Sequence, residues 1–397
     1  MLLYNKTYFD NFYLLQIAKE WKKSGTIGEA EYTSIAKQYP SPYKSFHIFA
    51  RLGLFIFTQF ALGSFTGLFN LMFMEAHFFK YVTFQFFFFG SISYVLAELS
   101  IRTFSFFKTG IKGALLYAAV SSLCLGMIGL ITNGDFNFDT DLLSSFICVF
   151  PIIAFTAIRF ADKLLSFCAF ACVIIINALV VLKMGTFGKI ILPFESMAVS
   201  YFVYYLIGKF KDREELHYWR NCMVLVETLS LITLYLSGNY MVIRVLTVAL
   251  LDTPIGPGED IPLAFFFYAY TIIVPLIYVW IGLKKKDYTF LRAGLILEIG
   301  GILAIKYYHS FLPPETAMSL GGIVLILLAY VGIKYLKTPR NGITFELYKR
   351  SSRDETLTNI ASVLVSKVVA DQQMTPKPEG IEPGGGQFGG GGAGADY

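Results

Sequence analysis

The chain has 397 residues, of which 55% are hydrophobic and only 15% charged, and its formal net charge is +5. Soluble domains usually carry about a quarter charged residues, so this composition, with a mean hydropathy of +0.58, excludes an ordinary soluble protein. The cations are spread over several loops rather than gathered in one basic patch, which excludes nucleic acid as the expected partner. We expect an all-α protein that spans the lipid bilayer.

The first 45 residues are polar and aromatic and precede the first apolar run. Residues 8–38 predict two short helices, the second of which ends before Pro40, and we expect them to form a cytoplasmic hairpin. This region has no apolar core that ends in small residues, so the first span is expected to act as an uncleaved signal anchor. The hairpin is one of two segments expected to bind a protein partner.

A helix rises about 1.5 Å per residue, so crossing about 30 Å of hydrocarbon takes roughly 20 apolar residues. Ten runs between residues 46 and 337 meet this requirement, and we expect one bundle of about ten helices. The predicted spans are 48–74, 81–100, 111–132, 142–159, 163–183, 189–208, 221–239, 262–283, 289–308 and 316–336.

Lysine and arginine favour cytoplasmic loops, so their distribution predicts the orientation. With the N-terminus inside, every inner loop is cationic, whereas two outer loops, 135–141 and 252–260, are acidic. Both ends are therefore expected in the cytoplasm. The inner cations are Arg102, Lys108, Lys112, Arg159, Lys163, Lys209, Lys211, Arg213, Arg220 and Lys284 to Lys286.

The polar C-terminal region follows the last predicted span. Residues 338–373 are expected to form a cytoplasmic segment, in which apolar residues at helical spacing over 356–371 predict an amphipathic helix. Such a helix would lie on the membrane or on a protein partner. Residues 374–397 are rich in proline and glycine, which predicts a disordered tail.

The sequence contains no nucleophile-elbow, zinc-protease or phosphate-loop motif. The four histidines lie far apart, and the five cysteines sit in apolar runs without metal-ligand spacing. We therefore expect no enzyme activity, no cofactor and no metal site. Asn177, Asn239 and Arg244 are polar residues in or near spans, for which structural roles are expected.

Four carboxylates inside predicted spans are the candidate intramembrane polar site: Glu98, Glu195, Glu227 and Glu298. A charge in hydrocarbon costs roughly 2.5–3.5 kcal/mol, so each must face a cavity, pair with a cation or take up a proton. In a transporter they would form a proton or cation site. Otherwise each would pair or hydrogen-bond within a helix–helix contact.

Glu298 is the most interior of the four. Gly294 and Gly301 lie beside it on a helix, together with Leu295, and such small residues allow close approach of a neighbouring helix. We expect a packed position in the bundle interior. Glu98 and Glu227 occupy similar places in the second and seventh spans, which either reflects two inverted halves or arose by chance.

The N-terminal pattern Trp21-x-x-x-Gly25-x-Ile27, followed by a span opening at Ala50-Arg51-Leu52-Gly53, resembles an uncharacterised family of bacterial polytopic membrane proteins with a cytoplasmic helical hairpin. The mid-chain stretch from Arg159 to Leu165 is similar to a pattern in some members. The resemblance implies a multi-pass protein of the bacterial cytoplasmic (inner) membrane. It implies no activity or site residues.

Three functions remain open from the sequence. The first is a transporter-like protein or membrane scaffold, the second a secondary transporter with an intramembrane Glu as its proton or cation site, and the third a component of a bacterial envelope complex. A transporter needs polar groups that converge at mid-depth, whereas a scaffold needs only exposed docking surfaces.

Overall fold

A computed structural model describes residues 2–23, 28–72, 78–132, 138–211, 213–251, 260–285 and 287–308, and five isolated helical positions between 323 and 334. The chain divides into two units, 1–313 and 314–397, and the architecture below is that of the first. The segments expected at 316–336 (apart from those five positions), 338–373 and 374–397 lie outside the described residues.

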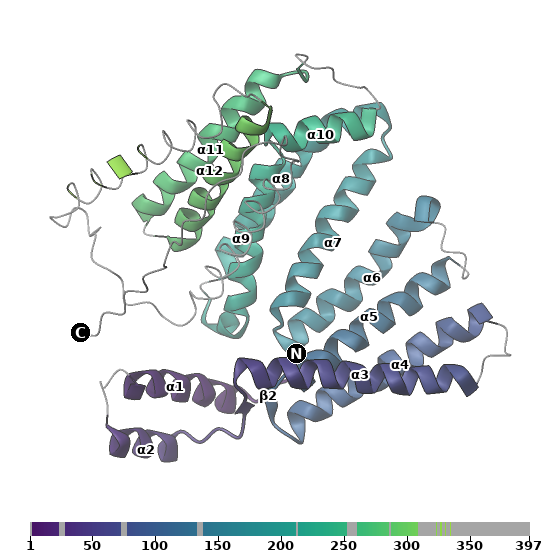
Figure 1. Cartoon of the computed structure of the whole chain (residues 1–397), viewed down its shortest axis with the longest axis vertical. Helices are drawn as coiled ribbons and strands as arrows, with labels where there is room; N and C mark the ends of the chain where they lie inside the picture. Colours follow the sequence, from purple (N-terminus) through teal and green to yellow (C-terminus); the bar gives the residue numbers. More distant parts are fainter. Residues whose placement is uncertain are drawn as a thin grey trace, which may run out of the picture. The chain divides into compact units, whose positions relative to one another are not determined.

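The described residues form α-helices, one 3-10 helix and a small two-stranded sheet, so the expected all-α class is confirmed (Figure 1). The N-terminal hairpin region contains α1 (Lys6–Lys23) and α2 (Glu29–Gln38). The remaining helices are α3 (Ile48–Met72), α4 (Phe78–Arg102), α5 (Ile111–Ile131), α6 (Phe138–Phe160), α7 (Lys163–Leu182), α8 (Thr186–Phe210), η1 (Glu214–Trp219), α9 (Arg220–Leu236), α10 (Tyr240–Leu251), α11 (Ala264–Lys285) and α12 (Tyr288–Tyr308).

Seven of these helices are long and apolar enough to cross a membrane, namely α3 to α8 and α11. An eighth span results if η1 and α9 are joined to α10, although that segment bends by 70° at a short break. These helices are those of a multi-pass membrane protein. The seventh span was predicted to end at residue 239, and the prediction missed α10, which continues the apolar segment in a new direction.

Helices that follow one another in the chain pack as pairs. The most extensive contacts join α4 to α5, α11 to α12, α6 to α7 and α8 to α9. Contacts of α5 with α6, of α7 with α8 and α9, and of α9 with α12 link these pairs to one another. The helices of the last contact carry two of the four candidate carboxylates, Glu227 on α9 and Glu298 on α12.

A short parallel sheet ties two helix starts together. β1 (Lys44–Ser45) directly precedes α3, β2 (Phe106–Lys108) directly precedes α5, and Lys44 pairs with Phe106. Gly110 caps α5 with a φ of 85°, and a Cβ there would overlap the Arg51 carbonyl oxygen. A glycine is needed at this position, because the left-handed backbone and the close approach both disfavour a side chain.

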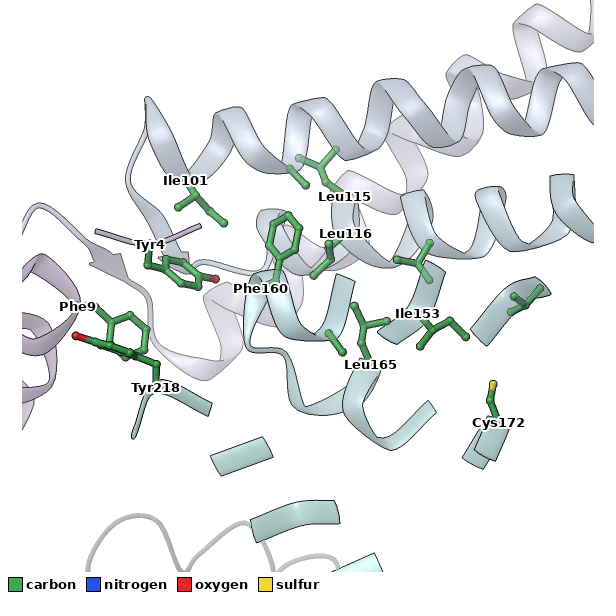
Figure 2. Close-up of a cluster of buried hydrophobic side chains, with 14 residues drawn as sticks. Tyr4, Phe9, Ile101, Leu115, Leu116, Ile153, Phe160, Leu165, Cys172 and Tyr218 are labelled. Carbon is green, nitrogen blue, oxygen red and sulfur yellow. The ribbon is translucent and has the colours of Figure 1, made fainter. Parts of the chain in front are cut away.

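The largest buried cluster includes the N-terminal segment as well as the spans. Tyr4 and Phe9 lie with Phe160, Leu116 and Tyr218 in one apolar core (Figure 2). Aromatic packing of this kind buries large apolar area and favours edge-to-face geometry. One face of α1 is therefore occupied by its own chain, whereas the N-terminal hairpin had been expected to offer its surface to a partner.

Rings from α1 and from the residues that precede it surround Phe107 of β2. The ring centroid of Phe107 lies 5.1 Å from that of Tyr4, 5.3 Å from Phe9 and 5.0 Å from Phe12. The Lys112 Nζ donates a hydrogen bond of 2.9 Å to the Tyr4 hydroxyl. These contacts fasten the N-terminal segment to the predicted cytoplasmic end of α5.

Candidate functional site: carboxylates among the spans

Glu98 is held by arginines near the C-terminal end of α4. Arg159, at the end of α6, donates from Nε to Oε1 at 2.5 Å, and Arg102 lies 3.4 Å from Oε2. The Glu98 side chain is 18% exposed and that of Arg159 is 23% exposed. Two cations at the predicted membrane edge neutralise this carboxylate, so it forms a structural link between α4 and α6.

Glu227 is the most deeply buried of the four, with 1% of its side chain exposed. The Nζ of Lys211, which caps the C-terminus of α8, donates to Oε1 at 2.7 Å. Lys211 also lies 4.0 Å from Asp287, whose side chain accepts from the backbone N–H of Thr289 at the start of α12. One lysine therefore joins α8, α9 and α12.

Glu195 lies on α8 and accepts a hydrogen bond from the Nδ2 of Asn177 on α7. An amide can satisfy a carboxylate oxygen without neutralising its charge. The pair is a polar contact between two adjacent helices, which agrees with the structural role expected for Asn177.

Glu298 differs from the other three, because no hydrogen bond or ion pair joins its carboxylate to another described residue. The Oε2 atoms of Glu227 and Glu298 are both buried without a donor among the described residues, but Glu227 is bound to Lys211 through Oε1. The phenol of Tyr235 on α9 reaches the turn of α12 that follows Glu298, at Gly301. Leu295 was expected on the packed face with Glu298 but is half-exposed, because the packed face of α12 runs through Gly294, Leu297 and Gly301.

Glycines on α12 bring the neighbouring helices close to Glu298. A Cβ at Gly301 would lie 2.9 Å from the Tyr235 hydroxyl, and one at Gly294 would lie 2.8 Å from Val279 on α11. Both distances are below van der Waals contact, so a larger residue would push the helices apart. The two glycines expected beside Glu298 thus permit the phenol to reach the turn that follows the carboxylate.

The break between α9 and α10 lies next to this position. Asn239 donates from Nδ2 to the Tyr235 hydroxyl at 2.8 Å, and its Oδ1 accepts from the backbone N–H groups of Met241 and Val242. The backbone N–H of Tyr240 donates to Thr271 Oγ1 at 2.9 Å. These bonds satisfy the donors that the break releases, as a buried helix start requires.

Beyond the break, α10 is attached to the residues that precede α11. The Tyr240 hydroxyl donates to Asp260 at 2.6 Å, and Arg244 donates to that hydroxyl at 2.7 Å and lies 3.6 Å from Asp260. The side chains expected to be structural, Asn239 and Arg244, therefore hold the N-terminal half of α10.

No hydrogen bond or ion pair within the described ranges joins two of the four glutamates. Glu227 and Glu298 face the same helix contact at different depths, because Glu298 lies about 16 Å along α12 from Asp287. The structure instead brings the turn of α12 that follows Glu298 against Tyr235 and Thr271, at Gly301. Sequence reasoning missed Tyr235, Thr271 and the break itself, although the Gly238-Asn239 pair is a break signal in an apolar run that could have indicated this region.

Comparisons give no relatives. No family model matches the chain, no curated protein is similar to it, and no solved structure resembles it. The site therefore has to be interpreted from this chain alone.

The cysteines and the described histidines are also of a type that can ligate a metal ion. Within the described residues, no group of three or more His, Cys, Asp or Glu side chains is arranged to hold a metal ion. All five cysteines are free thiols.

Proposed function

We propose that the protein is a transporter-like multi-pass membrane protein in which Glu298 binds a proton or a small cation. The observation that carries the proposal is that Glu298 has a buried Oε2 and no cation or hydrogen-bond donor among the described residues, whereas Glu227, whose Oε2 is buried in the same way, is bound to Lys211. An isolated carboxylate in an apolar medium is stable only when it is protonated or bound to a cation. Glu98 and Glu227 have cationic partners that meet this requirement within the protein, whereas Glu195 accepts a hydrogen bond from the amide of Asn177.

The break between α9 and α10 supports the same proposal. Transporters commonly place ion sites where a spanning helix is interrupted, because irregular backbone is tolerated in a membrane only where it is packed in protein or lines a cavity. Asn239 and Tyr235 connect the break to the turn of α12 that carries Glu298. A proton or cation at Glu298 would therefore affect the segment that changes direction.

The experiment that tests this proposal measures flux in vesicles. The protein, reconstituted with a pH-sensitive dye inside, is given a proton, Na⁺ or K⁺ gradient, and the flux is recorded over a range of pH. Glu298→Gln should leave the protein folded and abolish the pH dependence. Glu195→Gln is the matched control and should retain it. Unchanged pH dependence in Glu298→Gln would contradict the proposal.

The proposal includes a topology of ten spans with both ends in the cytoplasm of a bacterium, in the inner membrane. It is supported by the ion pairs of Glu98 and Glu227, which lie at helix ends that the cationic loops assign to the same side. Reporter fusions after Lys286 and after Gly134 test it. A cytoplasmic signal at Gly134, or a periplasmic one at Lys286, would overturn the topology.

A membrane scaffold or envelope-complex component is the second candidate, and the exposure of α3 favours it. None of the most apolar part of α3 is buried in the protein. Either lipid or a partner span covers that surface. Extraction in mild detergent and native electrophoresis distinguish the two, since a scaffold should migrate in a complex larger than the 44.6 kDa chain, whereas a lone chain would contradict this candidate.

A further inference from the structure

A groove of about 380 Å³ with several polar side chains in its lining lies between α3, α4 and α5. A volume of this size suits a small organic molecule. Most of the side chains that line it carry a hydroxyl or an amide, although the groove is formed by three apolar helices. These polar side chains are Gln59, Thr66, Ser93, Tyr117, Ser121 and Ser122.

The groove lies near the middle of the spans. Because β1 and β2 place the starts of α3 and α5 side by side, equal distances along the two helices correspond to similar depths. Gln59 lies about 16 Å along α3 from Ile48, and Ser122 lies about 16 Å along α5 from Ile111. Polar groups at this depth are not explained by contact with water or lipid headgroups at the membrane surface.

Several of these groups have hydrogen-bonding capacity to spare. Gln59 donates from Nε2 to the Ala114 carbonyl at 3.1 Å, which leaves its Oε1 as an acceptor. Thr66 and Ser121 donate to carbonyls of their own helices and so can still accept. The hydroxyls of Ser93 and Ser122 make no hydrogen bond within the described residues and can do both. A ligand that matches these side chains must both donate and accept hydrogen bonds.

The lining has no charged side chain. The nearest carboxylate with a contact to it is Asp162, which accepts from the Tyr117 hydroxyl at 3.3 Å. A charged ligand would therefore lie in the apolar interior without a counter-charge, at a large cost. The rings of Phe89 and Tyr117 supply apolar surface beside the hydroxyls, the combination that a sugar ring requires, since it has C–H faces and an edge of hydroxyl groups.

We propose that this groove binds a neutral, hydroxyl-rich group of the size of a hexose. Such a group occurs both in free sugars and polyols and in the headgroups of glycolipids. The assignment does not depend on Glu298, which belongs to a different set of helices.

Ligand-dependent thermal unfolding of the full chain, purified in a zwitterionic detergent that contains no sugar, tests this inference. Free glucose and octyl glucoside are the two probes, and an octyl chain on a zwitterionic headgroup is the control for the alkyl chain. A probe at ten times its Kd should raise Tm by about 2 °C in a saturable manner. A rise with glucose identifies a soluble sugar, whereas a rise with octyl glucoside alone identifies a glycolipid headgroup.

Two matched pairs of variants locate the site. A Cβ at Gly63, which lines the groove, or at Gly53, which does not, would meet no atom within 4 Å, so both accept leucine without a clash. Gly63→Leu should fill the groove and abolish the rise in Tm, and Gly53→Leu should retain it. Ser93→Ala combined with Ser122→Ala should weaken binding at least tenfold, whereas Ser200→Ala on α8 should not.

Two results would overturn the inference. One is the absence of a saturable rise in Tm with either probe in the unmodified protein. The other is a rise that is the same in Gly63→Leu as in Gly53→Leu, because binding would then take place outside the groove.

Discussion

The contact between α9 and α12 holds two carboxylates in opposite ways. At one level, Glu227 is almost fully buried and is bound to Lys211, which also approaches Asp287. At the other level, Glu298 is less buried and no described cation pairs with it, while the phenol of Tyr235 reaches the next turn of α12 at Gly301. Burial alone therefore does not indicate which of the two is structural, since the more buried carboxylate is the one with the better partner.

The difference between Glu227 and Glu298 shows two ways in which a contact between apolar helices can accommodate a carboxylate. A buried ion pair satisfies both charges locally, but the removal of one partner leaves the other uncompensated. A carboxylic acid without a cation is tolerated when it is neutral, and its replacement by an amide changes little. The two levels should thus respond in opposite ways to the same kinds of substitution.

The largest effect is expected for Lys211→Met. It leaves the carboxylate of Glu227 buried without its cation, which should lower the free energy of unfolding by about 3–5 kcal/mol. Urea unfolding in detergent measures this loss. The double variant with Glu227→Leu should recover most of the stability, and a loss below about 1 kcal/mol in the single variant would show that Lys211 is not the main partner.

Arg159→Met should have a smaller effect, about 1–2 kcal/mol, although the hydrogen bond to Glu98 is shorter than that of Lys211 to Glu227. Glu98 is partly exposed and keeps Arg102 at 3.4 Å, so its charge remains compensated. The same unfolding measurement at low and high salt tests this, since only the more exposed pair should weaken with salt. Equal losses for Arg159→Met and Lys211→Met would contradict the role of burial.

Tyr235→Phe removes the acceptor of the Asn239 amide at the break, and we expect a loss of about 1 kcal/mol. Tyr270→Phe is a suitable control, because its hydroxyl donates only to the Leu234 carbonyl of α9 in the described contacts. In the flux measurement, Tyr235→Phe should shift the pH dependence and Tyr270→Phe should not. An unshifted pH profile in Tyr235→Phe would show that Tyr235 does not influence the proposed site.

The smallest effect is expected for Glu298→Gln, below about 0.5 kcal/mol, because the amide keeps the shape of a neutral acid. Glu227→Gln is the direct comparison and should lose clearly more, since it removes the attraction to Lys211. Urea unfolding in detergent measures the free energy of unfolding of both variants. A larger loss for Glu298→Gln would mean that its carboxylate is charged and paired.

Hydropathy predicted most of the helices within a few residues, because apolar runs of this length have no other stable state in a bilayer. For example, the predicted span 111–132 is α5 (Ile111–Ile131), and 163–183 is α7 (Lys163–Leu182). The bend after α9 was not predicted. It depends on Asn239 capping α10 and on Thr271 of α11 accepting a bond, which are tertiary contacts that periodicity does not contain.

The four glutamates were identified from the cost of charge in hydrocarbon, but their partners were not. Arg159 is distant from Glu98 in sequence, and the pairing depends on how α4 and α6 end. Lys211 had been assigned only to an inner loop, whereas it reaches back to Glu227 from the end of α8. Such ion pairs depend on which helices pack against one another, and a single sequence does not give that packing.

The small sheet of β1 and β2 has a consequence for the order of assembly. The most extensive helix contact of α3 is with α5 rather than with α4, its neighbour in the chain. The Arg51 carbonyl against Gly110 and the pairing of Lys44 with Phe106 also join α3 to the later segment. During synthesis α3 must therefore remain in contact with lipid until α4 has crossed the membrane and β2 has been synthesised. Pairing of β1 with β2 at the membrane surface is the step at which α3 can pack against α5.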